Sequence, residues 1–190
     1  MPRENERKFL LKNSNWKKGV ASKDTIYQGY VSWDKVEIVV KPNLLVIITE
    51  GMKIIKPLDD KETEELKENL HREEKVLRVR KKNNKYLVTI KIDVGDFGSP
   101  IEVEKDLNVD EFDHLNKLIY AYISKVRNNV KVGSHIFEID EFKGKNEGLI
   151  IAEVELENIN DAYEVPEWLG EEVTGIPEYY NEKIARSNCN

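Results

Sequence analysis

Charged and apolar residues alternate along several short segments of the chain. Same-sign charges stand two residues apart in Arg78-x-Arg80, Glu102-x-Glu104, Lys125-x-Arg127, Glu138-x-Asp140 and Glu153-x-Glu155, and the chain opens with Glu4-x-Glu6-x-Lys8. Most of the residues between these charges are apolar. On a β-strand, residues two apart lie on one face, roughly 7 Å from each other. The pattern therefore predicts strands with one charged face and one apolar face.

Eight segments have this strand pattern and lie between turn signals. They are residues 4–11, 25–32, 75–82, 86–92, 101–105, 125–132, 134–142 and 149–157. Asn83 and Asn84 separate two of them, and asparagine tolerates the positive φ of a tight hairpin turn. Eight antiparallel strands are enough to close a barrel wide enough for one small ligand.

Helical spacing is readable in three places. A helix is predicted after Asn108, with its apolar stripe running through Phe112 and Leu115 as far as Tyr122. A second is predicted after residues 58–60, and a short third one after Pro177. The predicted class is α+β: an eight-stranded antiparallel β-barrel, or tunnel, with a charged lumen and helices covering its outside.

Residues 34–74 differ from the rest of the chain. Residues 36–40 and 44–48 are apolar and β-branched, a turn joins them, and an acidic helical segment follows, with no paired charges. We predict a single domain over residues 1–190 with a hairpin-plus-helix insertion at about 34–74. Its expected role is surface decoration or a homodimer contact.

Composition narrows the class of protein. The 190 residues carry 30 basic and 36 acidic side chains, a net charge of −6, which argues against a broad nucleic-acid surface. The chain has one cysteine, Cys189, and no apolar run near the ~20 residues that span a bilayer. The charged opening, residues 2–8, argues against a signal peptide. We expect a cytoplasmic protein with neither nucleic-acid nor membrane partners.

The charged faces allow two interpretations. A sheet with one face in water also alternates apolar and polar residues, and its ion pairs contribute under about 1 kcal/mol each. Against this, the sign is uniform within most strands, and arginine appears where lysine would suffice. Carboxylates without His or Cys favour Mg²⁺ or Mn²⁺, and Arg and Lys match phosphate oxygens. This combination is typical of phosphoryl transfer without a P-loop.

The ordered motifs resemble a known family. Glu4-Asn5-Glu6-Arg7-Lys8, Gln28-Gly29-Tyr30, Leu77-Arg78-Val79-Arg80, Lys91, Phe137-Glu138-Ile139-Asp140 and Ile151-Ala152-Glu153-Val154-Glu155 follow the order of the CYTH domain, the triphosphate tunnel metalloenzymes. The similarity is greatest to short bacterial members and covers most of the chain outside about residues 34–74. It implies a tunnel that binds a small linear triphosphate and hydrolyses it with Mg²⁺ or Mn²⁺.

The resemblance also implies residue roles. Those matching the family's phosphate-binding cations are Lys8, Arg78, Arg80, Lys91, Lys125 and Arg127. Those matching its metal-binding carboxylates are Glu4, Glu6, Asp140, Glu153 and Glu155, with Glu102 and Glu104 expected at a second metal or a water. Tyr30 and Lys91 are the expected catalytic residues, although a phenol with a pKa near 10 is a poor base unless cations lower that pKa.

Two departures from the family pattern bear on function. The insertion lengthens the link between the Gln28 and Arg78 strands, and Pro100 stands where relatives often carry an arginine. The leading expectation is an inorganic triphosphatase. The alternatives are an adenylate cyclase-like lyase of class IV acting on ATP, a thiamine or nucleoside triphosphatase, and a non-catalytic polyphosphate-binding module.

Overall fold

The computed structural model describes residues 6–95, 100–158 and 160–187. They form two compact units, Gln28–Tyr122 (unit 1) and residues 6–27 with 123–187 (unit 2). Strands β2 (Val20–Val31) and β9 (Ile119–Val132) contribute residues to both. That the whole chain is a single domain stays a prediction. No helix among the described residues is long and apolar enough to cross a membrane.

Unit 1 contains an antiparallel sheet with hydrogen-bonded order β2-β6-β7-β8. Its strands β6 (Lys75–Lys82), β7 (Lys85–Ile92) and β8 (Ile101–Leu107) follow the predicted segments closely. Asn83 has φ +53° in the β6–β7 turn, as the predicted hairpin requires. The register places Arg78 opposite Thr89, and Thr89 opposite Glu104, so these three residues share one face.

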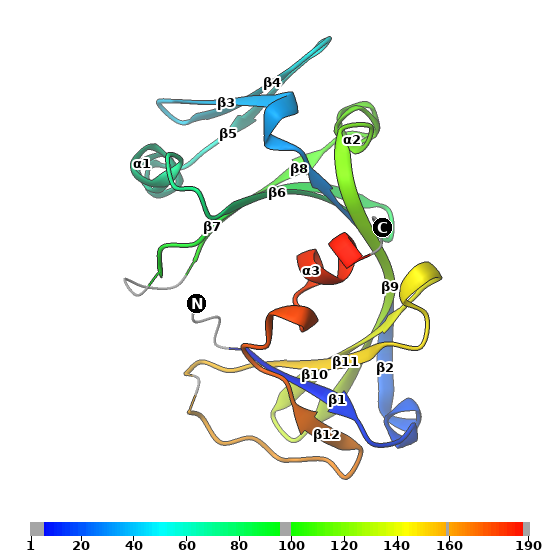
Figure 1. Cartoon of the computed structure of the whole chain (residues 1–190). Coiled ribbons are helices and arrows are strands. Elements are labelled where there is room, and N and C mark those ends of the chain that lie inside the picture. The colour runs from blue at the N-terminus through cyan, green and yellow to red at the C-terminus, as the bar shows by residue number, and fades with distance from the viewer. Residues whose placement is uncertain (1–5, 96–99, 159, 188–190) are drawn as a thin grey trace. The chain divides into compact units, whose positions relative to one another are not determined.

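The insertion in unit 1 forms a small sheet of its own and a helix. Its strands are β3 (Val36–Lys41), β4 (Leu44–Thr49) and β5 (Met52–Pro57), and α1 (Asp60–Asn69) follows (Figure 1). The sequence predicted only the hairpin of β3 and β4, whereas the structure adds a third strand, β5. Gly51, with φ +86°, lies in the turn that leads into β5. A capping box between Asp59 and Glu62 starts α1 at the predicted place.

Hydrogen bonds join this small sheet to α2 (Val109–Asn116) within unit 1. Lys56 Nζ lies 2.6 Å from Glu111 Oε2, and Thr49 Oγ1 lies 2.7 Å from His114 Nε2. Leu44 and Ile55 are exposed on the same small sheet. The role of the insertion, whether decoration or dimer contact, stays a prediction.

Helix α2 is shorter than the sequence pattern predicts. It begins after the Asn108 cap as expected, but it ends at Asn116, and β9 begins at Ile119. Residues 118–122 fit the helical stripe by spacing, yet Ile119, Ala121 and Ile123 also alternate with period two. Pairing in the sheet overrides the helical pattern here.

Unit 2 contains an antiparallel sheet with order β12-β1-β11-β10-β9-β2. It is built from β1 (Glu6–Leu11), β10 (His135–Phe142), β11 (Ile150–Glu155) and β12 (Leu169–Glu172), together with β9 and β2. The first three of these match predicted segments, whereas β12 was not predicted. Strand β1 is an interior strand, second from the edge, because it pairs with β11 on one side and β12 on the other.

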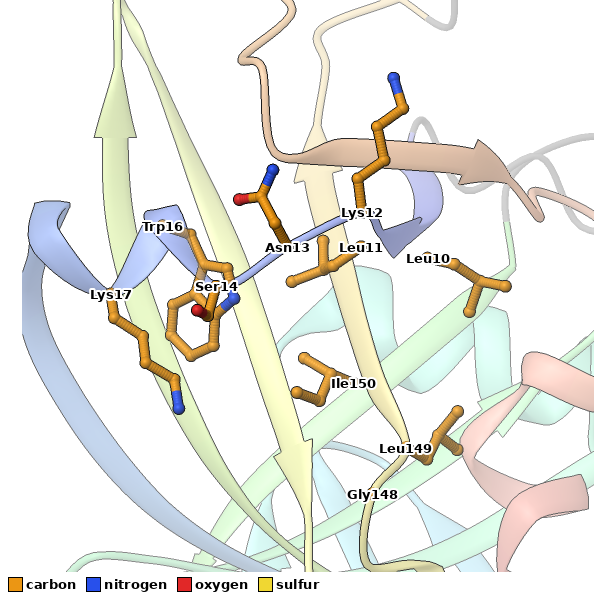
Figure 2. Close-up of a pocket in the computed structure, with 10 residues that line it drawn as sticks. All are labelled: Leu10, Leu11, Lys12, Asn13, Ser14, Trp16, Lys17, Gly148, Leu149 and Ile150. Carbon is orange, nitrogen blue, oxygen red and sulfur yellow. The ribbon is translucent and has the colours of Figure 1, made fainter.

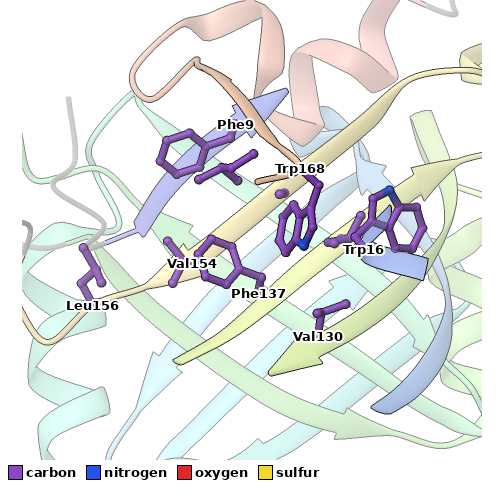
Figure 3. Close-up of a cluster of buried hydrophobic side chains, with 10 residues drawn as sticks. Phe9, Trp16, Val130, Phe137, Val154, Leu156 and Trp168 are labelled. Atoms are coloured by element: carbon purple, nitrogen blue, oxygen red, sulfur yellow. The ribbon is translucent and has the colours of Figure 1, made fainter. Parts of the chain in front are cut away.

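In the described residues, the apolar face of the unit 2 sheet is covered by tryptophans and not by an α-helix. Figure 3 shows Trp16 and Trp168 against this face, with Phe137 beneath them. The Phe137 and Trp168 rings meet edge to face with centroids 5.3 Å apart. Trp16 comes from the short 3-10 helix η1 (Asn15–Gly19) and is 2% exposed. The prediction of an outer helical cover is therefore wrong for this unit.

In unit 1, helices do cover the sheet. Phe112 of α2 packs against Tyr86 of β7 at 4.9 Å between ring centroids, and Leu115 is fully buried. On α1, Glu62 accepts hydrogen bonds at 2.6 and 2.8 Å from Lys105 of β8. Each unit therefore leaves its charged face on the side of the sheet opposite to this apolar packing.

Close packing between β1 and β12 leaves no room for a side chain at Gly170. A Cβ at this position would lie 2.5 Å from the Leu10 carbonyl oxygen, a backbone atom that cannot rotate away. We expect Gly170→Ala to lower the free energy of unfolding by about 1–3 kcal/mol. Urea unfolding measures this, with the exposed neighbour substitution Glu171→Ala as a control. Equal stabilities of the two variants would contradict the expectation.

Candidate functional site

The charged face of unit 2 brings basic and acidic rows together across four strands. Lys8 lies opposite Glu153, Glu153 opposite Glu138, and, one row on, Asp140 opposite Arg127. The register also sets Glu138 directly opposite Glu153, a like-charge pair that is destabilising without compensation. Cations from the flanking strands provide that compensation.

Lys8 neutralises two carboxylates on this face. Its Nζ lies 2.5 Å from Glu153 Oε1 and 2.6 Å from Glu6 Oε1. The Lys8 side chain is 7% exposed, so both ion pairs are shielded from water. The Coulomb attraction within these pairs is less screened than in a surface salt bridge, and it offsets the cost of burying the charges.

Arg127 contacts three carboxylates at once. Its Nη2 donates to Asp140 Oδ2 at 2.6 Å and to Glu153 Oε2 at 2.8 Å, while its Nη1 donates to Glu138. Nε completes a bidentate contact to Asp140 at 2.8 Å. The planar guanidinium suits this arrangement, because its donors point in fixed directions.

Lys125 is the most deeply buried cation of the group. Its Nζ lies 2.5 Å from Asp140 Oδ2 and donates at 3.1 Å to Asn181 Oδ1, at the start of α3 (Asn181–Arg186). Its side chain is 2% exposed. Helix α3 therefore contacts the charged face of unit 2, not the apolar one.

Burial and crowding shift the ionisation of these groups in opposite directions. Burial, together with nearby Glu153, raises the pKa of Glu6, and burial raises the pKa of Glu138. Burial would also raise the pKa of Glu153, but Lys8, Lys125 and Arg127 together hold it well below its ordinary value. Burial lowers the pKa of Lys125 despite Asp140. Burial therefore favours the protonated form of Glu6 and Glu138, whereas the surrounding cations keep Glu153 ionised.

The depressed pKa of Glu153 predicts acid sensitivity. An acid with a lowered folded-state pKa contributes stability above its ordinary value of 4.5, and this contribution is lost as pH falls below it. We expect Glu153→Gln to flatten the loss of stability on acidification between about pH 5 and 3. Urea midpoints against pH test this, with exposed Glu147→Gln as the matched control. An acid limb as steep as that of the native protein would refute the prediction.

The charged face of unit 1 is built around Arg78. Its Nη2 donates to Thr89 Oγ1 at 3.1 Å and to Glu102 Oε1 at 2.9 Å, and lies 3.5 Å from Glu104 Oε2. Thr89 Oγ1 donates to Glu104 at 2.9 Å. Nε of Arg78 is buried and has no hydrogen-bond partner among the residues the structure describes. A buried cationic donor left in this state suits an anion acceptor.

Arg80 lies on the same face of unit 1 and contacts a buried amide. Its Nε donates to Gln28 Oε1 at 3.2 Å, and Gln28 Nε2 donates to the Tyr30 hydroxyl at 2.7 Å. Gln28 is 1% exposed and Tyr30 3% exposed. Lys91 is opposite Glu102 in the β7–β8 register, and so shares this charged face.

The structure groups most of the predicted site residues within the two faces. Unit 1 holds Arg78, Arg80, Lys91, Glu102, Glu104 and Tyr30; unit 2 holds Lys8, Lys125, Arg127, Glu6, Asp140 and Glu153. Glu155 lies opposite Glu6 but is exposed. Glu4 lies outside the described residues. The roles assigned to all these residues stay predictions.

Sequence reasoning missed four residues on these faces. Glu138 was noted in the Glu-x-Asp pattern but not assigned, and its contact with Arg127 follows from that same spacing. Thr89 and Gln28 are polar residues on strands, and both are buried. Their burial marks them as candidate site residues, but it cannot be read from the sequence. Asn181 belongs to a helix whose contact with Lys125 joins residues 56 positions apart.

The carboxylates of unit 2 fit a hard divalent cation by their chemistry. They offer only oxygen donors, the ligands that Mg²⁺ and Mn²⁺ prefer. Within the described ranges, no three acidic, histidine or cysteine side chains are grouped closely enough to hold a metal ion. The carboxylates engage Lys8, Lys125 and Arg127 instead.

A cavity of about 350 Å³ lies elsewhere in unit 2, where β1 ends and β11 begins (Figure 2). Its lining is Leu10, Leu11, Lys12, Asn13, Ser14, Trp16, Lys17, Gly148, Leu149 and Ile150. It contains none of the predicted site residues and no carboxylate side chain. The charged faces are therefore the better candidates for phosphate chemistry.

Comparison with known families agrees with the motif order. Residues 62–187, more than half of the chain, match the model of the CYTH domain. The chain belongs to the CYTH family. The match begins at residue 62, within helix α1 of the insertion, so the Glu6–Lys8 motif and Tyr30 lie outside the matched residues.

Bacterial CYTH relatives are similar over most of their own length. An inorganic triphosphatase of Acetivibrio thermocellus is 35% identical over 116 residues, covering 60% of this chain and 74% of that protein. One from Nitrosomonas europaea is 33% identical over 115 residues, covering 58% and 75%. The solved inorganic triphosphatase NE1496 aligns with a TM-score of 0.58 at 23% identity over 95% of both chains. The α+β, mostly antiparallel fold of this chain is therefore that of the CYTH triphosphatases.

Proposed function

We propose that this CYTH protein hydrolyses a linear triphosphate, most specifically inorganic tripolyphosphate, in a metal-dependent reaction. The observation that carries the proposal is the buried set of interleaved cations and carboxylates in unit 2, centred on Lys8, Arg127 and Glu153. The names of the two bacterial relatives support the choice of substrate.

In this proposal the ion pairs of the structure are exchanged when substrate binds. Arg127 and Lys8 would transfer their hydrogen bonds from carboxylates to phosphate oxygens, which accept from guanidinium and ammonium groups equally well. Arg78 and Arg80 would do the same on the face of unit 1. The closed eight-stranded tunnel implied by the family resemblance is part of the proposal.

The released carboxylates would then hold the cation. Glu6, Glu153, Asp140 and Glu155 are the proposed ligands of Mg²⁺ or Mn²⁺, with Glu138 added by its position beside them. When bound, such a cation neutralises phosphate charge and lowers the pKa of a coordinated water. Glu102 and Glu104 are proposed to lie at a second metal or a water.

Tyr30 and Lys91 are the proposed catalytic residues of unit 1. Lys91 would stabilise the charge that develops on the phosphoryl oxygens. Tyr30 would contact the substrate through its hydroxyl. Binding groups on rigid strands hold the polyanion in one position, which is the main contribution a protein makes to phosphoryl transfer.

A substrate panel tests the proposal. Purified protein is assayed for phosphate release from tripolyphosphate, ATP and thiamine triphosphate, each with Mg²⁺, with Mn²⁺ and with a chelator. We expect the highest kcat/KM for tripolyphosphate and loss of turnover with the chelator. If the protein formed cyclic AMP from ATP, the proposed hydrolase function would be rejected in favour of the adenylate cyclase alternative.

Variants separate the site from the rest of the protein. Lys91→Ala and Glu153→Gln should reduce turnover, whereas Lys61→Ala, an exposed change on α1, should not. Tight tripolyphosphate binding with no turnover under any metal would select a binding module. If saturating tripolyphosphate with Mg²⁺ left the melting temperature unchanged, a triphosphate site would be excluded altogether.

A further inference from the structure

The small sheet of the insertion has two edge strands, β3 and β5, because β4 lies between them. An edge strand presents backbone N–H and C=O groups that can pair with another strand, and proteins commonly protect such edges with lysine or proline. Strand β5 has this protection, since it carries Lys53 and Lys56 and ends at Pro57.

Strand β3 lacks comparable protection. Its register with β4 runs from Val36 to Lys41 without a bulge, and its lysine comes only at the last position. Residues that favour strand pairing occupy most of it, namely Val36, Ile38, Val39 and Val40. Within the described residues β3 pairs with β4 alone, so its outer edge is open to a further strand.

The two charges of β3 stand symmetrically about its middle. Glu37 and Lys41 are each two residues from Val39, so all three lie on one face of the sheet. Both charged residues are exposed, and neither forms an ion pair with another described residue. If a second β3 ran antiparallel with the two Val39 residues opposite each other, Glu37 of each copy would lie opposite Lys41 of the other. The same register sets Ile38 opposite Val40 of the second copy.

We propose that two copies of this chain dimerise by pairing β3 with β3 about a twofold axis, so that the three strands of each copy form one continuous antiparallel sheet. The charge pattern selects a second copy as the occupant of this edge, because the pairing gives two cross-strand pairs of opposite charge. Of the two roles expected for the insertion, this inference selects the homodimer contact and gives it a register. It does not depend on the reaction that the protein catalyses.

The arrangement also limits assembly to two copies. The outer edges of the joined sheet are the two β5 strands, whose lysines and proline disfavour further pairing. A twofold contact uses the same strand on both copies and therefore closes, whereas pairing of β3 with β5 of another copy would continue as a filament.

Charge reversal tests both the dimer and its register. Sedimentation velocity of the full native chain over a range of protein concentrations should show a monomer–dimer equilibrium. Glu37→Lys sets lysine opposite lysine twice, and Lys41→Glu sets glutamate opposite glutamate twice, so each should raise the dissociation constant about tenfold or more. The matched control is Lys53→Glu, an exposed change on β5 that alters net charge as Lys41→Glu does and should leave the equilibrium unchanged.

Two restoration experiments decide the register. The double variant Glu37→Lys/Lys41→Glu again has opposite charges in both pairs and should recover the native dissociation constant. An equimolar mixture of the two single variants should form a heterodimer, because one has lysine at both positions and the other glutamate.

A native chain that stays monomeric at every concentration would overturn the proposal. Single variants that dimerise as the native chain does, or that neither restoration rescues, would also overturn it. A dimer weakened by Lys53→Glu but not by Lys41→Glu would place the contact on another surface and reject the pairing of β3.

Discussion

Replacing Arg127 by alanine is expected to cost about 3–5 kcal/mol in the free energy of unfolding, because buried carboxylates would lose their common partner. The guanidinium contacts Glu138, Asp140 and Glu153, and its side chain is only 16% exposed. Removing it would leave the Glu138–Glu153 pair facing each other, with Lys8 paired to Glu153 but no hydrogen bond from Arg127 to either acid. Denaturant unfolding at neutral pH measures the loss.

Two variants control this result. Arg186→Ala removes an exposed i,i+4 pair with Glu182 and should change stability by less than about 0.5 kcal/mol. Arg127→Lys keeps the charge but cannot reach three carboxylates at once, so an intermediate loss is expected. An Arg127→Ala protein as stable as the Arg186→Ala protein would show that the cluster does not depend on this guanidinium.

Replacing Arg78 by alanine is expected to lower kcat/KM for tripolyphosphate by about 10²–10³, the usual effect of removing one preorganised charged donor. Its Nε is buried and lacks a partner within the described part of the chain, so phosphate would supply the acceptor that the protein does not. Initial rates across substrate concentrations measure the effect.

Stability distinguishes this loss from misfolding. Arg78 pairs with Glu102 and Glu104, whose side chains are 42% and 36% exposed, so their release to water should cost little. The control is Lys81→Ala, an exposed change three positions along the same strand. A fall in kcat/KM of the same size in both variants would contradict a specific role for Arg78.

The strands that carry charge pairs were predictable because period-two alternation gives both the strand and its faces. The Arg78 and Arg80 strand was placed at its observed bounds for this reason. Strand β12 could not be found this way, since Leu169–Glu172 is four residues long and has a glycine where the Leu10 carbonyl approaches. Its existence depends on pairing with β1, more than 150 residues earlier.

The grouping of acids and bases was predictable, but their partners were not. Spacing places Lys125 with Arg127 and Glu153 with Glu155 on common faces. Which cation meets which acid depends on cross-strand register, which joins Lys8 to Glu153 over 145 residues. The sequence-based prediction also treated the acids as open metal ligands, whereas the structure pairs them with Lys8, Lys125 and Arg127.

The position of β1 between β11 and β12 has a consequence for synthesis on the ribosome. Unit 1 is one continuous stretch, Gln28–Tyr122, and can complete its contacts as soon as it has emerged. Strand β1 leaves the ribosome before unit 1 but must wait for β11 and β12, which follow unit 1 in the sequence. Its apolar residues, including Phe9, stay unsheltered until β11 and β12 have emerged, so the nascent chain is most prone to aggregate during that interval.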